Sequence, residues 1–198
     1  MKTTFTAVPR GALLLAAALL APTLAQAHTG VASTGGFAHG FSHPLGGLDH
    51  LCAMIAVGLW AAQMGGRAIW AVPLTFVSVM ALGGFLGMTQ MHLPLVETGL
   101  VLSVLMLGVF IAAAARLPLA ASVVIVGLFA LCHGVAHGSE MPVAASGLTF
   151  ALGFVLATSL LHTVGIGLGV GIQKASQPLV VRLTGGAIAL CGLCLWVA

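Results

Sequence analysis

Two short runs of the sequence hold most of the side chains that can coordinate a metal ion. One spans residues 43–50 and the other spans residues 133–140. Their imidazole and carboxylate groups together suit borderline divalent ions such as nickel, cobalt, zinc or copper, whereas a magnesium or calcium site uses oxygen almost alone. This chemistry predicts a transition-metal site. The side chains concerned are His43, Asp49 and His50 in the first run, and His133, His137 and Glu140 in the second.

The spacing within each run suits a helix. His43 and His50 are seven residues apart, which corresponds to two helical turns. In the second run His137 follows His133 by four residues, and Glu140 comes three residues later. In helices, the members of each run would therefore share a face, although Glu140 alone could equally be a solvated loop carboxylate.

Asp49 allows two interpretations. It could cap the first membrane helix, with residues 43–48 as a loop. However, the apolar run after Asp49 ends at Gly65 and is slightly short for a span, and Pro44 is well suited to the first helical position. We therefore expect Asp49 inside the helix. A charged side chain at the bilayer centre costs about 2.5–3.5 kcal/mol on insertion scales, which makes function the default interpretation of such a residue.

The composition indicates that these side chains are embedded in a membrane protein. Of 198 residues, 60% are hydrophobic and 5% charged, and the mean hydropathy is +1.20. These values are typical of a polytopic, all-α membrane protein with the lipid bilayer as its surroundings, and they exclude a soluble globular domain. Nucleic acid is not an expected partner.

The N-terminus has the features of a secretory signal. Residues 1–27 contain Lys2 and Arg10, an apolar run over residues 11–21, and an A-x-A cleavage site ending at Ala27. The alternative is an uncleaved first span, but the run stops at Pro22 and is too short to cross a bilayer comfortably. We predict a cleaved signal peptide, followed by a flexible external arm rich in His and Gly over residues 28–43.

Residues 44–198 then form the expected six-helix transmembrane domain. Lys and Arg are confined to alternate connections, whereas the connections over residues 89–94 and 138–145 contain neither. By the positive-inside rule, both ends of the mature chain lie outside the cytoplasm, in a bacterial inner membrane. The starts of the first and third spans and the end of the fourth then share the outer level, so Glu97 joins the two runs there. The spans are expected at residues 44–64, 68–88, 95–115, 118–137, 146–171 and 179–197.

For the other polar side chains within the spans, a structural role is expected more than a functional one. His162 lies deep in the fifth span, where hydrogen-bonded packing is favoured, although a second station for a translocating ion would look the same. The four cysteines fall in apolar runs and are expected to behave as small buried hydrophobic residues. They are Cys52, Cys132, Cys191 and Cys194.

At these residues the chain resembles the HupE/UreJ family of membrane proteins. The resemblance covers a leader, a short histidine-bearing arm, six spans, a His-x5-Asp-His motif in the first span and a His-Gly-x-x-His-Gly-x-Glu motif closing the fourth. The family is associated with hydrogenase and urease gene clusters and is regarded as a group of nickel or cobalt permeases. Cys132 departs from the pattern, because an aromatic residue commonly precedes the fourth-span motif.

The resemblance and the residues together predict a permease that carries Ni²⁺ or Co²⁺ inward and is not an enzyme. The ion is the transported substrate, and no cofactor is expected. No nucleotide-binding motif is present, and the membrane potential already favours entry of a dication. Metalloenzyme maturation would consume the ion, with a downstream metallochaperone as the expected partner. The predicted metal residues are His43, Asp49, His50, Glu97, His133, His137 and Glu140.

Two other functions fit parts of the pattern. An intramembrane hydrolase could use histidine-bound zinc to activate water, but the chain lacks a His-Glu-x-x-His arrangement. A b-type haem protein could use His50 and His133 as axial ligands. The accompanying Asp49 and Glu140 suit a dication better than a porphyrin.

Overall fold

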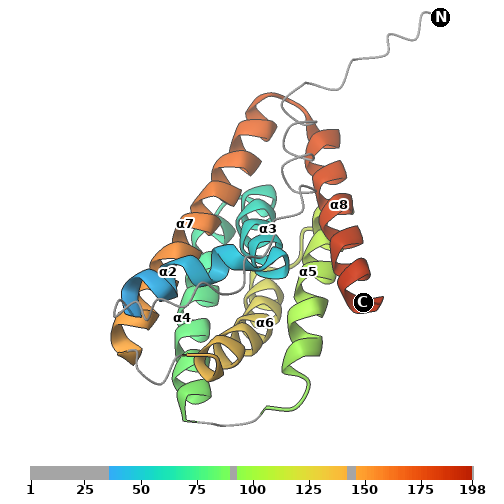
Figure 1. Cartoon of the computed structure of the whole chain (residues 1–198). Helices are drawn as coiled ribbons and strands as arrows, with labels where there is room; N and C mark the ends of the chain where they lie inside the picture. The colour runs from blue at the N-terminus through green and yellow to red at the C-terminus, as the bar shows by residue number, and fades with distance from the viewer. Residues whose placement is uncertain (1–35, 90–92, 142–145, 198) are drawn as a thin grey trace, which may run out of the picture. The chain divides into compact units, whose positions relative to one another are not determined.

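A computed structural model describes residues 36–89, 93–141 and 146–197, and within them every regular element is a helix (Figure 1). The predicted all-α class is confirmed. The predicted signal peptide lies outside the described residues. The helices are α2 (Gly36–Gly46), α3 (Leu48–Met64), α4 (Ala68–Met88), α5 (Val96–Ala112), α6 (Leu119–Ser139), α7 (Gly147–Lys174) and α8 (Pro178–Val197).

Four of these helices, α4, α6, α7 and α8, are each long and apolar enough to cross a membrane. The pair α2 and α3 passes the same test only when it is taken together, and it is bent by 84°. Helix α5 has 17 residues, or about 25 Å at 1.5 Å per residue, against roughly 30 Å of hydrocarbon. The chain is therefore a membrane protein with four to five candidate spans, and the six-span topology stays a prediction.

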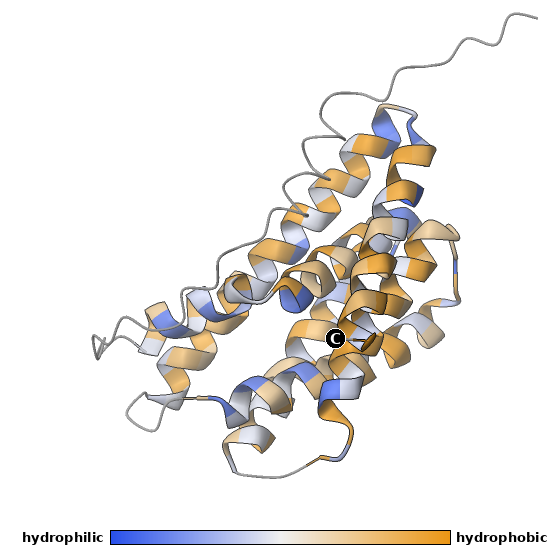
Figure 2. Ribbon diagram, turned by 45° about the vertical axis from the view of Figure 1, so that its right-hand side comes forward, coloured by the Kyte–Doolittle hydropathy of each residue, from blue (hydrophilic) through white to orange (hydrophobic). Residues whose placement is uncertain are grey.

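The outer faces of the long helices are as apolar as the interior. On α4, Trp70, Leu74, Leu82 and Phe85 are each more than 60% exposed. Hydrophobic residues continue along most of the length of the helices (Figure 2). Water would penalise such a surface, whereas hydrocarbon chains would not. The exposed residues are thus the expected lipid-facing side of a membrane bundle.

Helix α3 lies at the centre of the bundle. It contacts α2, α4, α5, α7 and α8, and it buries an almost continuous segment, residues 52–54 and 56–62. The largest of these side chains is Trp60, whose indole nitrogen donates to Ala115 O at 3.0 Å. A helix that is apolar on all sides needs neighbours on all sides, which explains why the others pack around it.

The chain bends sharply between α2 and α3. Gly47 adopts an extended conformation (φ −109°, ψ 132°) and precedes the first residue of α3, while Pro44 lies inside α2. The expectation that Pro44 starts the helix that carries Asp49 and His50 is therefore wrong, because that helix, α3, begins after the bend, and His43 and His50 lie on two helices rather than on one face of a single helix. Residues 36–42 were expected to be flexible, and this is also wrong, because they form the first turns of α2. Asp49 does lie inside its helix, in the first turn of α3, as predicted.

Glycines allow the main helix pairs to approach closely. A Cβ added to Gly83 of α4 would lie 2.7 Å from Leu131 O of α6. The same holds where α5 meets α8, because a Cβ on Gly108 would overlap the backbone of Ala189. Small residues are the usual means of close packing between helices in a membrane.

The crossing of α5 and α8 provides a stability test away from the polar residues. Gly108→Val should destabilise the bundle, because overpacking of a tight contact costs about 1–3 kcal/mol or more. Gly186→Val is the matched control, since no heavy atom lies within 4 Å of a Cβ added there. The measurement is the fraction of detergent-solubilised protein that stays monodisperse after heating. Equal melting of the two variants would contradict the described crossing.

Candidate metal site

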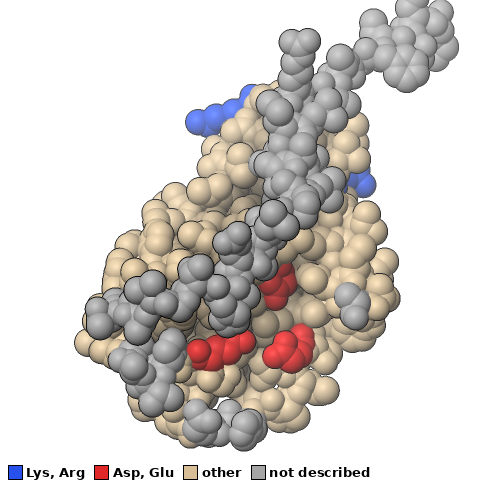
Figure 3. Space-filling model, in the orientation of Figure 1, with Lys and Arg blue, Asp and Glu red and all other residues tan. Residues whose placement is uncertain are grey.

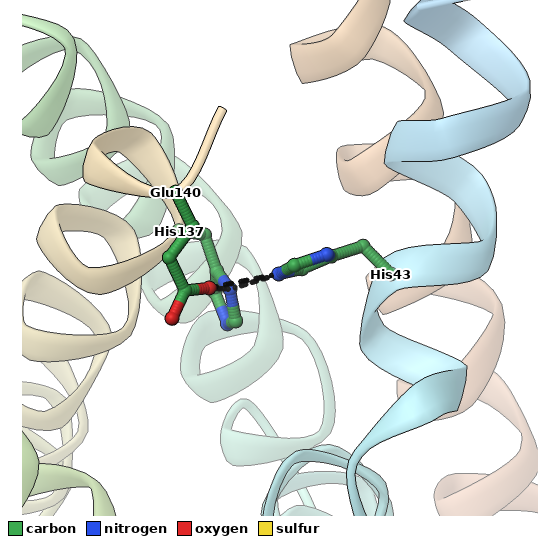
Figure 4. A group of neighbouring side chains, drawn as sticks. All are labelled: His43, His137 and Glu140. Atoms are coloured by element: carbon green, nitrogen blue, oxygen red, sulfur yellow. Dashed lines mark hydrogen bonds and ion pairs between the residues drawn. The ribbon is translucent and has the colours of Figure 1, made fainter. Parts of the chain in front are cut away.

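His43, His137 and Glu140 come together where α2 faces the last turn of α6 (Figure 4). His43 Nε2 lies 2.8 Å from His137 Nδ1 and 3.0 Å from Glu140 Oε2. His137 Nδ1 and Glu140 Oε2 are 3.4 Å apart. The two runs predicted to build one site therefore meet in space.

The spacing of these three atoms suits both hydrogen bonding and metal coordination. Bonds of about 2.1 Å from a central ion to its ligands place neighbouring ligand atoms roughly 3.0 Å apart in an octahedron and roughly 3.4 Å apart in a tetrahedron. The three separations span 2.8–3.4 Å. Only small side-chain adjustments would be needed for all three atoms to contact one ion.

Glu140 supplies negative charge to this group. It follows the last residue of α6, and its side chain is about half exposed. Hydrogen bonding with His137 and His43 holds the pKa of the Glu140 carboxyl well below its ordinary value. The group is therefore an ionised carboxylate at neutral pH, as coordination of a dication requires.

Asp49 and His50 form a second pair beside the first group. The His50 ring is the hydrogen-bond partner of the Asp49 carboxylate: His50 Nδ1–H donates to Asp49 Oδ1 at 2.8 Å. This bond leaves Nε2 as the unprotonated nitrogen, and that atom is buried without a hydrogen-bond partner among the described residues. A carboxylate that orients a histidine in this way is typical of metal sites.

His50 lies between the group formed by His43, His137 and Glu140 and a further histidine, His133. Its ring centroid is 4.3 Å from that of His137 and 5.3 Å from that of His133. His133 is 1% exposed, and its Nδ1–H donates to Phe129 O at 2.9 Å. The four imidazoles, His43, His137, His50 and His133, thus form a connected series that we call the histidine row.

Glu97 lies at the same end of the bundle but outside the closest group. It is in the first turn of α5 and lines a cleft of about 320 Å³ together with Ser139 and Glu140. Figure 3 shows acidic side chains close together on one face, with the basic side chains away from them. Glu97 therefore adds negative charge to the approach to the group formed by His43, His137 and Glu140.

Comparison with known proteins gives the chain a family. A family profile described as "HupE / UreJ protein" matches residues 15–195. The chain belongs to the HupE/UreJ family. A curated relative, "Protein HupE" of Rhizobium leguminosarum bv. viciae, is 46% identical over 182 residues, which cover 91% of this chain and 94% of the relative. No solved structure matches.

Membership in the HupE/UreJ family fixes the general class of the protein. The family is associated with nickel and cobalt uptake for hydrogenase and urease, and its members are transporters. The two histidine motifs that suggested the resemblance are the segments that the fold brings together. The resemblance inferred from the motifs is confirmed.

The structure of this HupE/UreJ protein also shows candidate site residues that the sequence did not reveal. Phe150 and Phe154 of α7 pack against the histidines, with the Phe154 and His137 ring centroids 4.5 Å apart. Gly47 packs directly against the Asp49–His50 pair. A Cβ added to Gly47 would be 2.5 Å from Asp49 Oδ1 and 2.9 Å from His50 Nδ1. Aromatic and glycine residues are too common in membrane helices for their types alone to have indicated these positions.

The first test of this site compares two histidines on α2. His43→Ala should weaken Ni²⁺ binding by at least about tenfold, as loss of a coordinating group or its support does in metal sites. His39→Ala should leave it unchanged, because His39 is exposed one turn earlier. Isothermal titration of purified protein measures both. Equal affinities in the two variants would rule out the convergence of α2 and α6 as the binding geometry.

The second test uses adjacent glycines. Gly47→Ala should weaken Ni²⁺ binding, because the added methyl group occupies the space in which Asp49 meets His50. Gly46→Ala is the matched control, since a Cβ there meets nothing within 4 Å. The same titration applies, with melting temperature recorded beside it. If Gly47→Ala binds as the wild type does, the Asp49–His50 hydrogen bond is dispensable for the site.

Proposed function

We propose that this protein is a permease that carries Ni²⁺ or Co²⁺ from the outside of the cell toward the cytoplasm. The observation that carries the proposal is the convergence of His43, His137 and Glu140 from two helices that are far apart in sequence. Two imidazoles and a carboxylate form a mixed nitrogen and oxygen set, which suits first-row divalent ions. The membership in a family of metal transporters supports the same assignment.

The proposed roles of the seven predicted residues differ. His43, His137 and Glu140 are the capture ligands, and His50 offers its free Nε2 as the next ligand. Asp49 holds His50 in the coordinating tautomer and adds negative charge. His133 receives the ion further along the histidine row. Glu97, beside Glu140 in the cleft, attracts cations toward the entrance.

The distribution of charge supports the proposed orientation. Arg67 precedes α4, Arg116 lies between α5 and α6, and Lys174 ends α7, so these cations lie at the helix ends opposite to Glu97 and Glu140. In the proposed topology the chain has six spans, the basic ends face the cytoplasm and the mature N-terminus lies outside an inner membrane. The acidic entrance then faces the external supply of ions.

The driving force for entry requires no nucleotide. A potential that is negative inside contributes about 2.3 kcal/mol per charge per 100 mV, hence about 4.6 kcal/mol for a dication. The remaining requirement is a route on which the ion is bound strongly enough to enter and weakly enough to leave. A cytoplasmic metallochaperone would then deliver the ion to hydrogenase or urease maturation.

The described contacts argue against a serine nucleophile and against a haem. The hydroxyl of Ser139 donates to Ala136 O at 2.6 Å, a bond within its own helix rather than one to a basic partner. For a haem, the rings of His137 and Phe76 already pack directly against His50 and His133, respectively. This packing leaves little space for a macrocycle between the two histidines.

Uptake of radiolabelled Ni²⁺ and Co²⁺ by metal-starved cells tests the proposal. Cells that express the wild type should show saturable uptake, and Asp49→Ala/His50→Ala should reduce it to background, because both the orienting carboxylate and the ligand are lost. His39→Ala serves as the matched control, and membrane abundance is measured for every variant. Normal uptake by an equally abundant double variant would refute the mechanism. Absence of uptake by the wild type would refute the permease assignment for these two ions.

A further inference from the structure

His162 lies near the middle of α7, apart from the histidine row. From Gly147 to His162 the helix rises about 22 Å, and from His162 to Lys174 about 18 Å, at 1.5 Å per residue. The side chain is 2% exposed. It therefore lies at a depth where water does not reach the helix from outside the bundle.

One nitrogen of the His162 ring is fixed and the other is free. Nδ1–H donates to Met54 O of α3 at 2.8 Å. The lone pair then resides on Nε2, and this atom is buried without a hydrogen-bond partner among the described residues. A buried polar atom left unpaired costs about 1–3 kcal/mol, so packing alone would be better served by an apolar side chain.

The fold holds this ring rigidly. Helices α3 and α7 cross where Gly58 meets Gly165, and a Cβ on Gly58 would overlap His162 O. The hydrogen bond to Met54 spans the same crossing. Because both backbone and ring are constrained, Nε2 has a defined position, as a ligand atom must.

A single aromatic ring connects His162 to the histidine row. The Phe76 centroid is 5.4 Å from that of His133 and 5.1 Å from that of His162. Ring contacts therefore follow one another from His43 along the histidine row to His133, and from there through Phe76 to His162. The His162 ring, with its unpartnered Nε2, is the described imidazole on the other side of this Phe76 contact.

The ligand chemistry at His162 differs from that at the entrance. The chain contains only three acidic residues, Asp49, Glu97 and Glu140, and all three lie at the entrance end. One turn before His162 on α7 is the buried Thr158, whose hydroxyl donates to Met80 Sδ at 3.8 Å, while the partly exposed Ser159 and exposed Thr163 bond to backbone carbonyls of their own helix. An ion at this depth would meet neutral ligands only, which favours brief binding and release.

From these observations we propose that His162 Nε2 is an inner station that binds the transported dication after it leaves the histidine row. The inference rests on the proposed permease function and extends it to a second binding position halfway along α7. The outer group captures the ion with carboxylate and imidazole ligands. The inner station passes it on with a neutral imidazole.

Two substitutions separate a ligand role from a packing role. The amide nitrogen of Asn can occupy the position of Nδ1, so His162→Asn retains the donor to Met54 O but lacks a ligand at the position of Nε2. The longer Gln side chain places its amide oxygen near the position of Nε2 and gives up the donor to Met54 O. If His162 is a ligand, the uptake rate should decrease from the wild type to His162→Gln and further to His162→Asn. If His162 only packs, His162→Asn should transport faster than His162→Gln.

The experiment measures initial rates of ⁶³Ni²⁺ uptake into cells together with Ni²⁺ titration of each purified full-length variant. For His162→Asn we expect the maximal rate to fall by about tenfold or more, with KM, the outer-site Kd and the melting temperature unchanged. His162→Gln should retain more of the rate. An Asn variant that transports as fast as the wild type, or faster than Gln, would overturn the inner station.

The wild type distinguishes failure of this inference from failure of the proposed function. Wild-type cells without Ni²⁺ or Co²⁺ uptake would refute both. Wild-type uptake that is lost in Asp49→Ala/His50→Ala but unchanged in His162→Asn would leave the permease standing and refute the inner station alone. A raised outer-site Kd in His162→Asn would also overturn it, because the substitution would then be acting on the entrance.

Discussion

Inside a bilayer, a polar side chain has no water to bond with and must find its partner in the protein. This constraint determines how the site is built. Asp49 accepts from His50, Glu140 interacts with His43 and His137, and His133 donates to the backbone of its own helix. For Asp49, His50 and His133 these contacts reduce the cost of burial, whereas Glu140 is about half exposed. At His50 the same hydrogen bond also leaves the buried Nε2 unprotonated and without a partner among the described residues. One contact therefore both satisfies Asp49 and prepares a coordinating nitrogen.

The apolar framework serves this arrangement by bringing backbones close together. Gly83 lets α4 approach α6, which carries His133, His137 and Glu140, and Gly58 lets α3 approach α7. Larger residues at these positions would separate the helices, and the polar groups would then lose contacts that are only 2.8–3.4 Å long. The abundance of glycine in the membrane helices is therefore a condition for the polar contacts.

Much of this could be predicted from particular residues. The spacing of His133, His137 and Glu140, and the alternation of basic and non-basic connections, predicted that two runs about 90 residues apart would meet. Helix α2 could not be predicted, because a segment of 11 residues with three glycines and an internal proline has little helical preference of its own. It forms because it packs on α7, where a Cβ on Gly40 would overlap Phe150 O. The Asp49–His50 contact was also beyond prediction, since adjacent residues on a regular helix point apart and only the bend at Gly47 gives the pair room.

The separation of the ligands between α2 and α6 has a thermodynamic consequence. His43 and His137 are 94 positions apart in the sequence. An ion held by both would act as a removable cross-link that closes this long segment, and ligation of the folded state alone stabilises it in proportion to RT ln(1 + [ion]/Kd). In the proposed permease, metal binding and folding would thus be linked: the external concentration of the ion would set how stably α2 is held against α6.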